Sequence, residues 1–159
     1  MEYSKKKMLG AMRGNCLNGL DKLIKSYNIE TVLEFGSGYS STWFAERVKC
    51  LYTADHDARW FPKGLKNVVC ITFGMKRGDF SDIDKIRKDY DLILIDCISI
   101  RHTRQRALDY VRKNLQWKIL SIHDWGRDRK KYDLEYLTQF EQESYGELKV
   151  FFNKNVRKK

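Results

Sequence analysis

From residue 31 onward, short apolar runs rich in β-branched and aromatic residues alternate with segments of helical periodicity. When a helix connects two strands, it carries the chain back across the sheet, so that the second strand runs parallel to the first. This alternation therefore predicts a mostly parallel sheet of about six strands. Helices would cover both faces of the sheet, which gives an α/β fold with three layers, α/β/α. The predicted strands span residues 31–35, 50–54, 68–73, 90–95, 118–122 and 148–152.

The length of the chain, 159 residues, is that of about one domain. A single proline, Pro62, and the lack of low-complexity stretches leave no visible linker. We therefore expect one domain with a helical extension over residues 1–30 and a core over 31–125. A C-terminal part over 126–159 would hold a helix at 131–142, one strand and a basic tail. The extension could form a lid over a site or pack on the sheet.

Hydropathy and cysteine spacing indicate the compartment. No apolar run approaches the ~18 residues that a membrane span needs, and the charged N-terminus lacks the apolar segment of a signal peptide. The four cysteines stand 34, 20 and 27 residues apart without a Cys-x-x-Cys pair, which disfavours a zinc site. We expect a cytoplasmic protein with buried free thiols at Cys16, Cys50, Cys70 and Cys97.

The net charge of +10 is unevenly distributed. Residues 31–97 carry ten basic and ten acidic side chains, whereas residues 98–159 carry fifteen basic and eight acidic ones. An excess of positive charge attracts polyanions. The C-terminal third could therefore bind nucleic acid or an acidic substrate, although solubility explains the excess equally well.

The stretch TVLEFGSGYSST, residues 31–42, ends a predicted strand and turns directly into a helix. Gly36 and Gly38 permit a tight turn and let a ligand approach the backbone, while the start of the helix offers unpaired N–H groups. Asp55 lies at the end of the next strand, about 20 residues on, where a carboxylate can accept both hydroxyls of a ribose. Two classes of adenosine ligand fit these features: dinucleotides and S-adenosylmethionine (SAM).

Two residues favour SAM over a dinucleotide. A dinucleotide fingerprint has a third glycine where this chain has Ser41. Glu34 stands directly before the turn, and a carboxylate at that point suits the cationic aminopropyl group of SAM better than it suits a pyrophosphate. The turn is therefore predicted to form part of a SAM pocket.

Five segments in order resemble the motifs of class I SAM-dependent methyltransferases, which have a Rossmann-like fold. VLEFGSGYS is similar to their first motif, with Ser40 in place of a frequent third glycine, and LYTADHD is similar to their second. RGDF resembles their adenine-lining segment, YDLILID their fourth strand and LSIHDW their fifth. The resemblance covers residues 31–125 and implies a SAM-dependent methyltransferase.

The resemblance also implies roles for single residues in cofactor binding. Glu34 and the backbone at Gly36 and Gly38 would hold the methionine part of SAM, and Asp55 would bind the ribose. Asp79 would contact the adenine amino group, with Phe80 beside the ring.

Catalysis is predicted to involve the ends of the fourth and fifth strands, where Asp96, His123 and Asp124 stand. Some O-methyltransferases of this fold bind Mg²⁺ through acids at these two strand ends, so Asp96 and Asp124 are candidate metal ligands. His123 is the alternative base, with an ordinary pKa near 6.5, unless strand alternation turns it away from the site. Arg101 and Arg104 would lie near the substrate and bind a carboxylate or phosphate, or else be solvated charges on a helix.

The sequence thus predicts a methyltransferase that acts on oxygen of a small or acidic acceptor. One alternative is a non-catalytic protein of the same fold that binds nucleic acid or a protein partner. Another is an NAD-binding oxidoreductase, which the serine at position 41 and the lack of a separate substrate domain disfavour.

Overall fold

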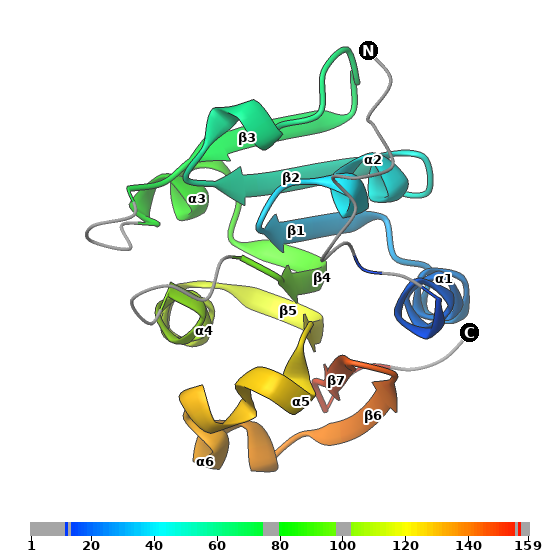
Figure 1. Cartoon of the computed structure of the whole chain (residues 1–159), viewed down its shortest axis with the longest axis vertical. Coiled ribbons are helices and arrows are strands. Elements are labelled where there is room, and N and C mark those ends of the chain that lie inside the picture. Colours follow the sequence, from blue (N-terminus) through cyan, green and yellow to red (C-terminus); the bar gives the residue numbers. More distant parts are fainter. Residues whose placement is uncertain (1–11, 13, 75–79, 98–102, 155, 157–159) are drawn as a thin grey trace.

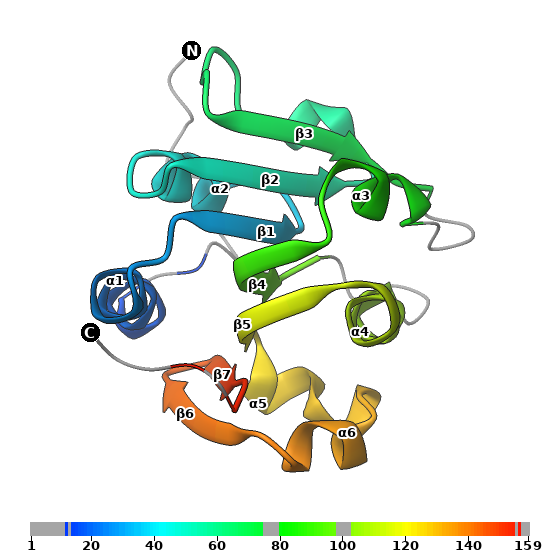
Figure 2. The same cartoon turned by 180° about the vertical axis from the view of Figure 1, so that it is seen from behind.

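The computed structural model describes residues 12, 14–74, 80–97, 103–154 and 156, and it contains one continuous seven-stranded sheet (Figures 1 and 2). The strand order across the sheet is β3-β2-β1-β4-β5-β7-β6. The strands are β1 Thr31–Phe35, β2 Cys50–Asp55, β3 Val68–Thr72, β4 Asp89–Ile95, β5 Gln116–Ile122, β6 Glu141–Tyr145 and β7 Leu148–Phe152.

The strands β1 to β5 pair in parallel, which confirms the predicted mostly parallel Rossmann-like sheet. From β1 the chain adds β2 and β3 on one side and then crosses over to add β4 and β5 on the other side. The junction between β1 and β4 is therefore a topological switch point. In open α/β sheets, ligands bind beyond the carboxyl ends of the strands at such a point.

The C-terminal part differs from the prediction, because it forms an antiparallel hairpin of β6 and β7 rather than a long helix and one strand. The predicted helix at 131–142 is wrong: it is replaced by a short helix, α6 (Leu134–Thr138), and the start of β6. The sequence of β6, EQESY, has no apolar alternation because the strand lies at the edge of the sheet and is mostly exposed. The sheet accordingly has seven strands, not six.

Helices cover both faces of the sheet, as predicted, and each face has its own apolar core. One core packs side chains of α1 and α2 against residues such as Val32 and Leu92. The other core packs α3 and α4 against alternate residues such as Leu33 and Ile93. Figures 1 and 2 show α1 and α4 on opposite sides of the sheet. The helices are α1 Asn15–Tyr27, α2 Tyr39–Ala45, α3 Ser81–Ile86, α4 Thr103–Asn114, α5 Trp125–Asp128 and α6, with 3₁₀ turns η2 Ala58–Trp60 and η3 Arg129–Lys131.

All four cysteines are free, as expected, but they are not all buried. Cys16 and Cys97 lie in the interior, Cys50 is half-buried and Cys70 is exposed. Cys70 lies on β3, the strand at the other edge of the sheet, where alternate side chains face outward. Among the described residues, no helix combines the length and apolar character needed to cross a membrane.

The packing of α1 on β6 depends on a glycine. Gly19 is buried, and a methyl group at its Cα would overlap the base of the Tyr145 ring. We expect Gly19→Ala to lower the free energy of unfolding by about 1–3 kcal/mol, because overpacking forces the ring or the helix to move. Asn18→Ala, at an exposed position one residue earlier, is the control and should change it by less than about 0.5 kcal/mol. Urea denaturation measures both, and equal stability of the two variants would contradict this account.

Candidate active site

The turn after β1 brings the chain very close to the end of β4. Gly36 has a φ of 104° and donates a hydrogen bond from its N–H to the carbonyl of Ala54 at 2.7 Å. A Cβ at this position would lie 2.7 Å from the backbone of Asp96 and from Cα of Cys97. Both the left-handed backbone and the close approach require glycine here.

Gly38 serves the turn in a different way, since a Cβ built on it would have no neighbour within 4 Å among the described residues. Its N–H donates to the Ser41 hydroxyl at 2.9 Å, and α2 begins at the next residue. Within the part of the chain that the structure describes, nothing therefore fills the space beside Gly38 at the carboxyl end of β1. That is the arrangement a ligand needs to approach the main chain closely.

Glu34 is completely buried beneath the turn rather than exposed in front of it. Its carboxylate accepts hydrogen bonds from the hydroxyls of Ser40, Ser41 and Thr53. Burial raises the pKa of Glu34 to about 7, although the three hydroxyl donors oppose this rise. Glu34 thus holds α2 and β2 against β1, and its predicted contact with the cofactor stays a prediction.

Asp55 lies at the end of β2, as predicted, and its carboxylate organises the same turn. One oxygen accepts the backbone N–H of Ser37 at 2.8 Å. The other accepts the N–H of Asp57 and contacts Nδ1 of His56, each at 2.9 Å. The predicted ribose contact would have to share these oxygens.

Of the two residues expected near an adenine ring, the structure describes only Phe80. Asp79 lies outside the described residues. Phe80 is buried in the core, where its ring packs against Phe35, Phe73 and Tyr110 at centroid distances of 4.9–5.5 Å. Phe80 is therefore a core residue in this structure, because the chain enters α3 with the ring turned toward the sheet.

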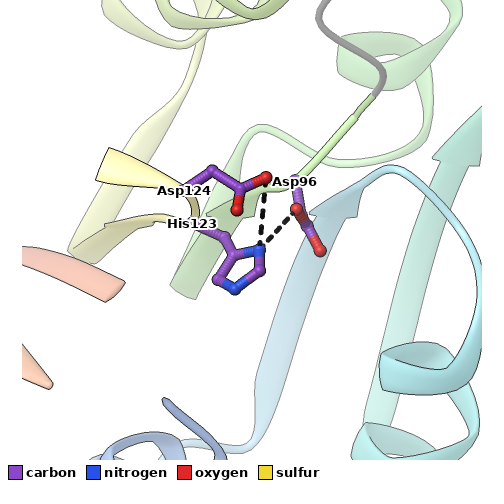
Figure 3. Close-up of side chains that lie close together, drawn as sticks. All are labelled: Asp96, His123 and Asp124. Carbon is purple, nitrogen blue, oxygen red and sulfur yellow. Dashed lines mark hydrogen bonds and ion pairs between the residues drawn. The ribbon is translucent and has the colours of Figure 1, made fainter. Parts of the chain in front are cut away.

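The structure brings Asp96, His123 and Asp124 together at the carboxyl ends of two neighbouring strands (Figure 3). Asp96 follows β4, and His123 and Asp124 follow β5. Nδ1 of His123 lies 2.9 Å from Asp96 Oδ1 and 3.8 Å from Asp124 Oδ2. Burial lowers the pKa of His123, but the hydrogen bond and charge of Asp96, helped by Asp124, outweigh burial and raise the pKa above its usual value. Nε2 points away from both carboxylates in Figure 3.

Strand alternation alone would send the side chains of His123 and Asp124 to opposite sides. The N–H of His123 continues the ladder by donating to the carbonyl of Ile95, but Asp124 then adopts a left-handed φ of 55°. Asparagine and aspartate tolerate this conformation better than most residues. It ends β5 and turns the Asp124 carboxylate back toward His123.

Arg104 was expected to bind the substrate or to be a solvated charge on a helix. The structure buries it instead, and only 5% of its side chain is accessible. Nε donates to the carbonyl of Cys97 and Nη1 to the carbonyl of His123, both at 2.7 Å. Its two Nη atoms also contact three carboxylates at 3.2–3.3 Å, those of Asp96, Asp124 and Asp128. Arg101 lies outside the described residues.

Sequence reasoning missed two members of this cluster. Asp128 on α5 is fully buried, and Arg127 is mostly exposed but reaches both Asp124, at 2.6 Å, and Asp128, at 3.1 Å. Their spacing could have predicted this, because they stand three and four residues after Asp124, and residues at these separations on a helical turn lie on the same face.

The predicted Mg²⁺ site would use the same carboxylates. One ligand atom from each of Asp96, His123 and Asp124 lies within 4.8 Å of the others, a spacing that a metal ion could use. However, Oδ1 of Asp96 already contacts Arg104, and Oδ2 of Asp124 contacts Arg104 and Arg127. One oxygen of each carboxylate is thus engaged by guanidinium groups, whose positive charge opposes a divalent cation at the same place, and no step below depends on a metal.

The environment of Glu34 generates a pH prediction. Its pKa in the folded protein, about 7, exceeds the ordinary value of 4.5, so between these values the folded protein holds a proton that the unfolded chain has lost. The contribution of Glu34 to stability must therefore fall as pH rises through this range. We expect wild type to lose about 2 kcal/mol relative to Glu34→Gln between pH 5 and pH 8. Urea unfolding at the two pH values measures this loss. If the difference in the free energy of unfolding between wild type and Glu34→Gln did not change with pH, the raised pKa of Glu34 would be refuted.

No protein-family model and no curated protein matches the sequence. Solved structures do match it, at low sequence identity. An rRNA methylase from Streptococcus thermophilus is 16% identical with a TM-score of 0.56, over 90% of this chain and 98% of that one. The O-methyltransferase TomG from Streptomyces achromogenes, solved with SAM, is 14% identical with a TM-score of 0.61, over 94% and 85%.

A third similar structure is the methyltransferase MycE of the mycinamycin pathway, in complex with Mg, S-adenosylhomocysteine (SAH) and mycinamycin VI. It is 12% identical with a TM-score of 0.68 over 92% of this chain, which spans about half of the MycE chain. The chain therefore has the Rossmann-like fold of the class I SAM-dependent methyltransferases.

Proposed function

We propose that the protein is a SAM-dependent methyltransferase that transfers a methyl group to an oxygen of a small or acidic acceptor. The observation that carries the proposal is the space beside Gly38, at the switch point of the sheet, which none of the described residues fills. The neighbouring strand ends carry Asp96, His123 and Asp124. A place for a ligand and a cluster of proton-accepting groups thus lie on the same rim of the sheet, the edge formed by the carboxyl ends of the parallel strands.

The residues around the turn fit an adenosine cofactor. Gly38 lets a ligand approach the main chain, while Gly36 and Asp55 fix the turn from below. Because Glu34 and its three hydroxyl partners are buried, they would support the pocket rather than line it. SAM, when bound, supplies a methyl group on a positively charged sulfur.

His123 is the residue best placed to accept a proton. In the reaction, the acceptor oxygen bonds to the methyl carbon while the carbon–sulfur bond breaks, which leaves SAH and requires the acceptor to lose its proton. The bond from Nδ1 to Asp96 favours the tautomer with hydrogen on Nδ1, so the lone pair is on Nε2. Asp96 would then orient the ring and stabilise the imidazolium that forms.

Exposed positive charge beside the cluster favours an acidic acceptor. Arg127, Arg129 and Lys130 lie shortly after Asp124 in the sequence and are exposed on α5 and η3. Two neighbouring aromatic side chains are not free to stack on nucleic acid bases, because Tyr132 is buried and Trp125 packs on Tyr132 and Phe151. A small carboxylated or phosphorylated acceptor therefore fits this surface better than a single strand of nucleic acid.

Calorimetric titration with SAH, with NAD⁺ in parallel, tests the cofactor class. We expect binding of SAH alone, in the micromolar range. Gly38→Ala should keep the wild-type stability, because the added methyl group meets open space, yet weaken SAH binding by about tenfold or more by filling part of the pocket.

Gly36→Ala is the contrasting variant, and it should lose stability by several kcal/mol because its Cβ has no room. Binding of NAD⁺ in place of SAH, or binding of neither ligand to wild type, would refute the proposed function. Unchanged SAH affinity in Gly38→Ala would move the pocket away from this turn.

The role of His123 predicts a separation between binding and turnover. His123→Asn should lower methyl transfer by about 10²–10⁴-fold, because no base accepts the proton, and should leave SAH affinity nearly unchanged. Transfer of label from methyl-tritiated SAM to a panel of hydroxylated, carboxylated or phosphorylated acceptors measures the first quantity. Asp124→Asn should likewise lower turnover more than affinity. Equal losses of turnover and affinity in either variant would show a structural role only.

A further inference from the structure

The guanidinium group of Arg104 occupies the centre of the carboxylate cluster. Its nitrogens reach two backbone carbonyls and three carboxylates, and these acceptors come from the ends of β4 and β5 and from α5. Arginine offers five donors in a fixed planar fork, so a single side chain can satisfy many acceptors at once. The fork is therefore built into this site rather than resting on its surface.

The charges of the cluster are close to balanced without any added ion. Asp96, Asp124 and Asp128 supply three negative charges, and Arg104 and Arg127 supply two positive ones within 3.3 Å of them. A divalent cation on the same oxygens would stand beside a buried guanidinium of like charge that cannot be deprotonated. It could bind only if Arg104 moved out and left Asp128 buried without this partner.

We propose that Arg104 is a built-in cation that takes the electrostatic place of a divalent metal between Asp96 and Asp124, so that the site works without one. Arg104 is then a positioning residue. It sets the separation of the two strand ends through the carbonyls of Cys97 and His123, and it fixes the Asp96 carboxylate that holds the His123 ring. The methyl-transfer part of this inference rests on the proposed function, whereas the part on metal binding does not.

Titration of the wild-type protein with Mn²⁺, followed by the loss of the electron paramagnetic resonance signal of the free ion, tests the metal-binding part directly. We expect no site with a Kd below about 100 μM. A tighter site that disappears in Asp124→Asn would overturn the proposal. The wild-type titration needs no known acceptor, and Asp124→Asn is needed only if wild type binds Mn²⁺ tightly.

Three variants separate charge from shape. Arg104→Gln removes the cation and should create a Mn²⁺ site at least about tenfold tighter than any in wild type. Arg104→Lys retains a positive charge and should create none. Arg112→Gln, at a half-exposed arginine paired with Asp133, changes the net charge by the same amount as Arg104→Gln and should also create none.

Circular dichroism shows whether each variant is folded. A folded Arg104→Gln that binds Mn²⁺ no better than wild type would contradict the role of Arg104 as a cation in this place. If this variant does not fold, the wild-type titration still decides the question.

The catalytic part is tested by methyl transfer in the presence of excess EDTA. We expect unchanged turnover, and restoration of a lost activity by Mg²⁺ would overturn the inference. Failure of SAH to bind would instead refute the proposed function and leave the Mn²⁺ result standing. The two ideas can thus fail separately.

Discussion

The buried ion pairs of Arg104 determine how the ends of β4 and β5 are arranged. Burying a charge is unfavourable unless it is paired and hydrogen-bonded. Arg104 satisfies this condition only where the carbonyls of Cys97 and His123 and the carboxylates around them converge. If the two strand ends were arranged differently, the guanidinium of Arg104 would lose these acceptors, and the fully buried Asp128 would lose its ion pair with Arg104. The geometry of the Asp96–His123 pair is therefore a consequence of this cluster.

The turn after β1 meets the same piece of backbone from the other side. The space that a Cβ on Gly36 would need is filled by Asp96 and Cys97, and the carbonyl of Cys97 is held by Arg104. The segment Asp96–Cys97 therefore contacts the turn at Gly36 on one side and the charged cluster around Arg104 on the other. Protein interiors are close-packed, so a shift of this segment on one side must be felt on the other. This contact gives a physical reason for both halves of the rim to keep a single geometry.

The sequence predicted the parts of the molecule that depend on local pattern. Apolar runs gave the five parallel strands, whereas β6 was missed because an exposed edge strand has no apolar face to show. Glu34 was placed correctly at the end of β1, but its burial depends on the register that pairs it with Thr53 and on the fold of α2. Arg104 was wrongly expected near solvent, because only the assembled strand ends provide acceptors for a buried guanidinium. Alternation could not predict the left-handed backbone at Asp124.

The raised pKa of His123 bears on when this residue could act as a base. In the free protein, Asp96 and Asp124 stabilise the charged imidazolium, which cannot accept a proton. A positive charge nearby has the opposite effect, as the guanidinium of Arg104 already shows by lowering the pKa of His123. In the proposed reaction, a sulfonium ligand at the Gly38 turn would add a second positive charge to the same rim and so favour the neutral ring. A bound methyl donor would therefore shift His123 toward the neutral form that accepts a proton, which links proton transfer to cofactor binding without a moving part.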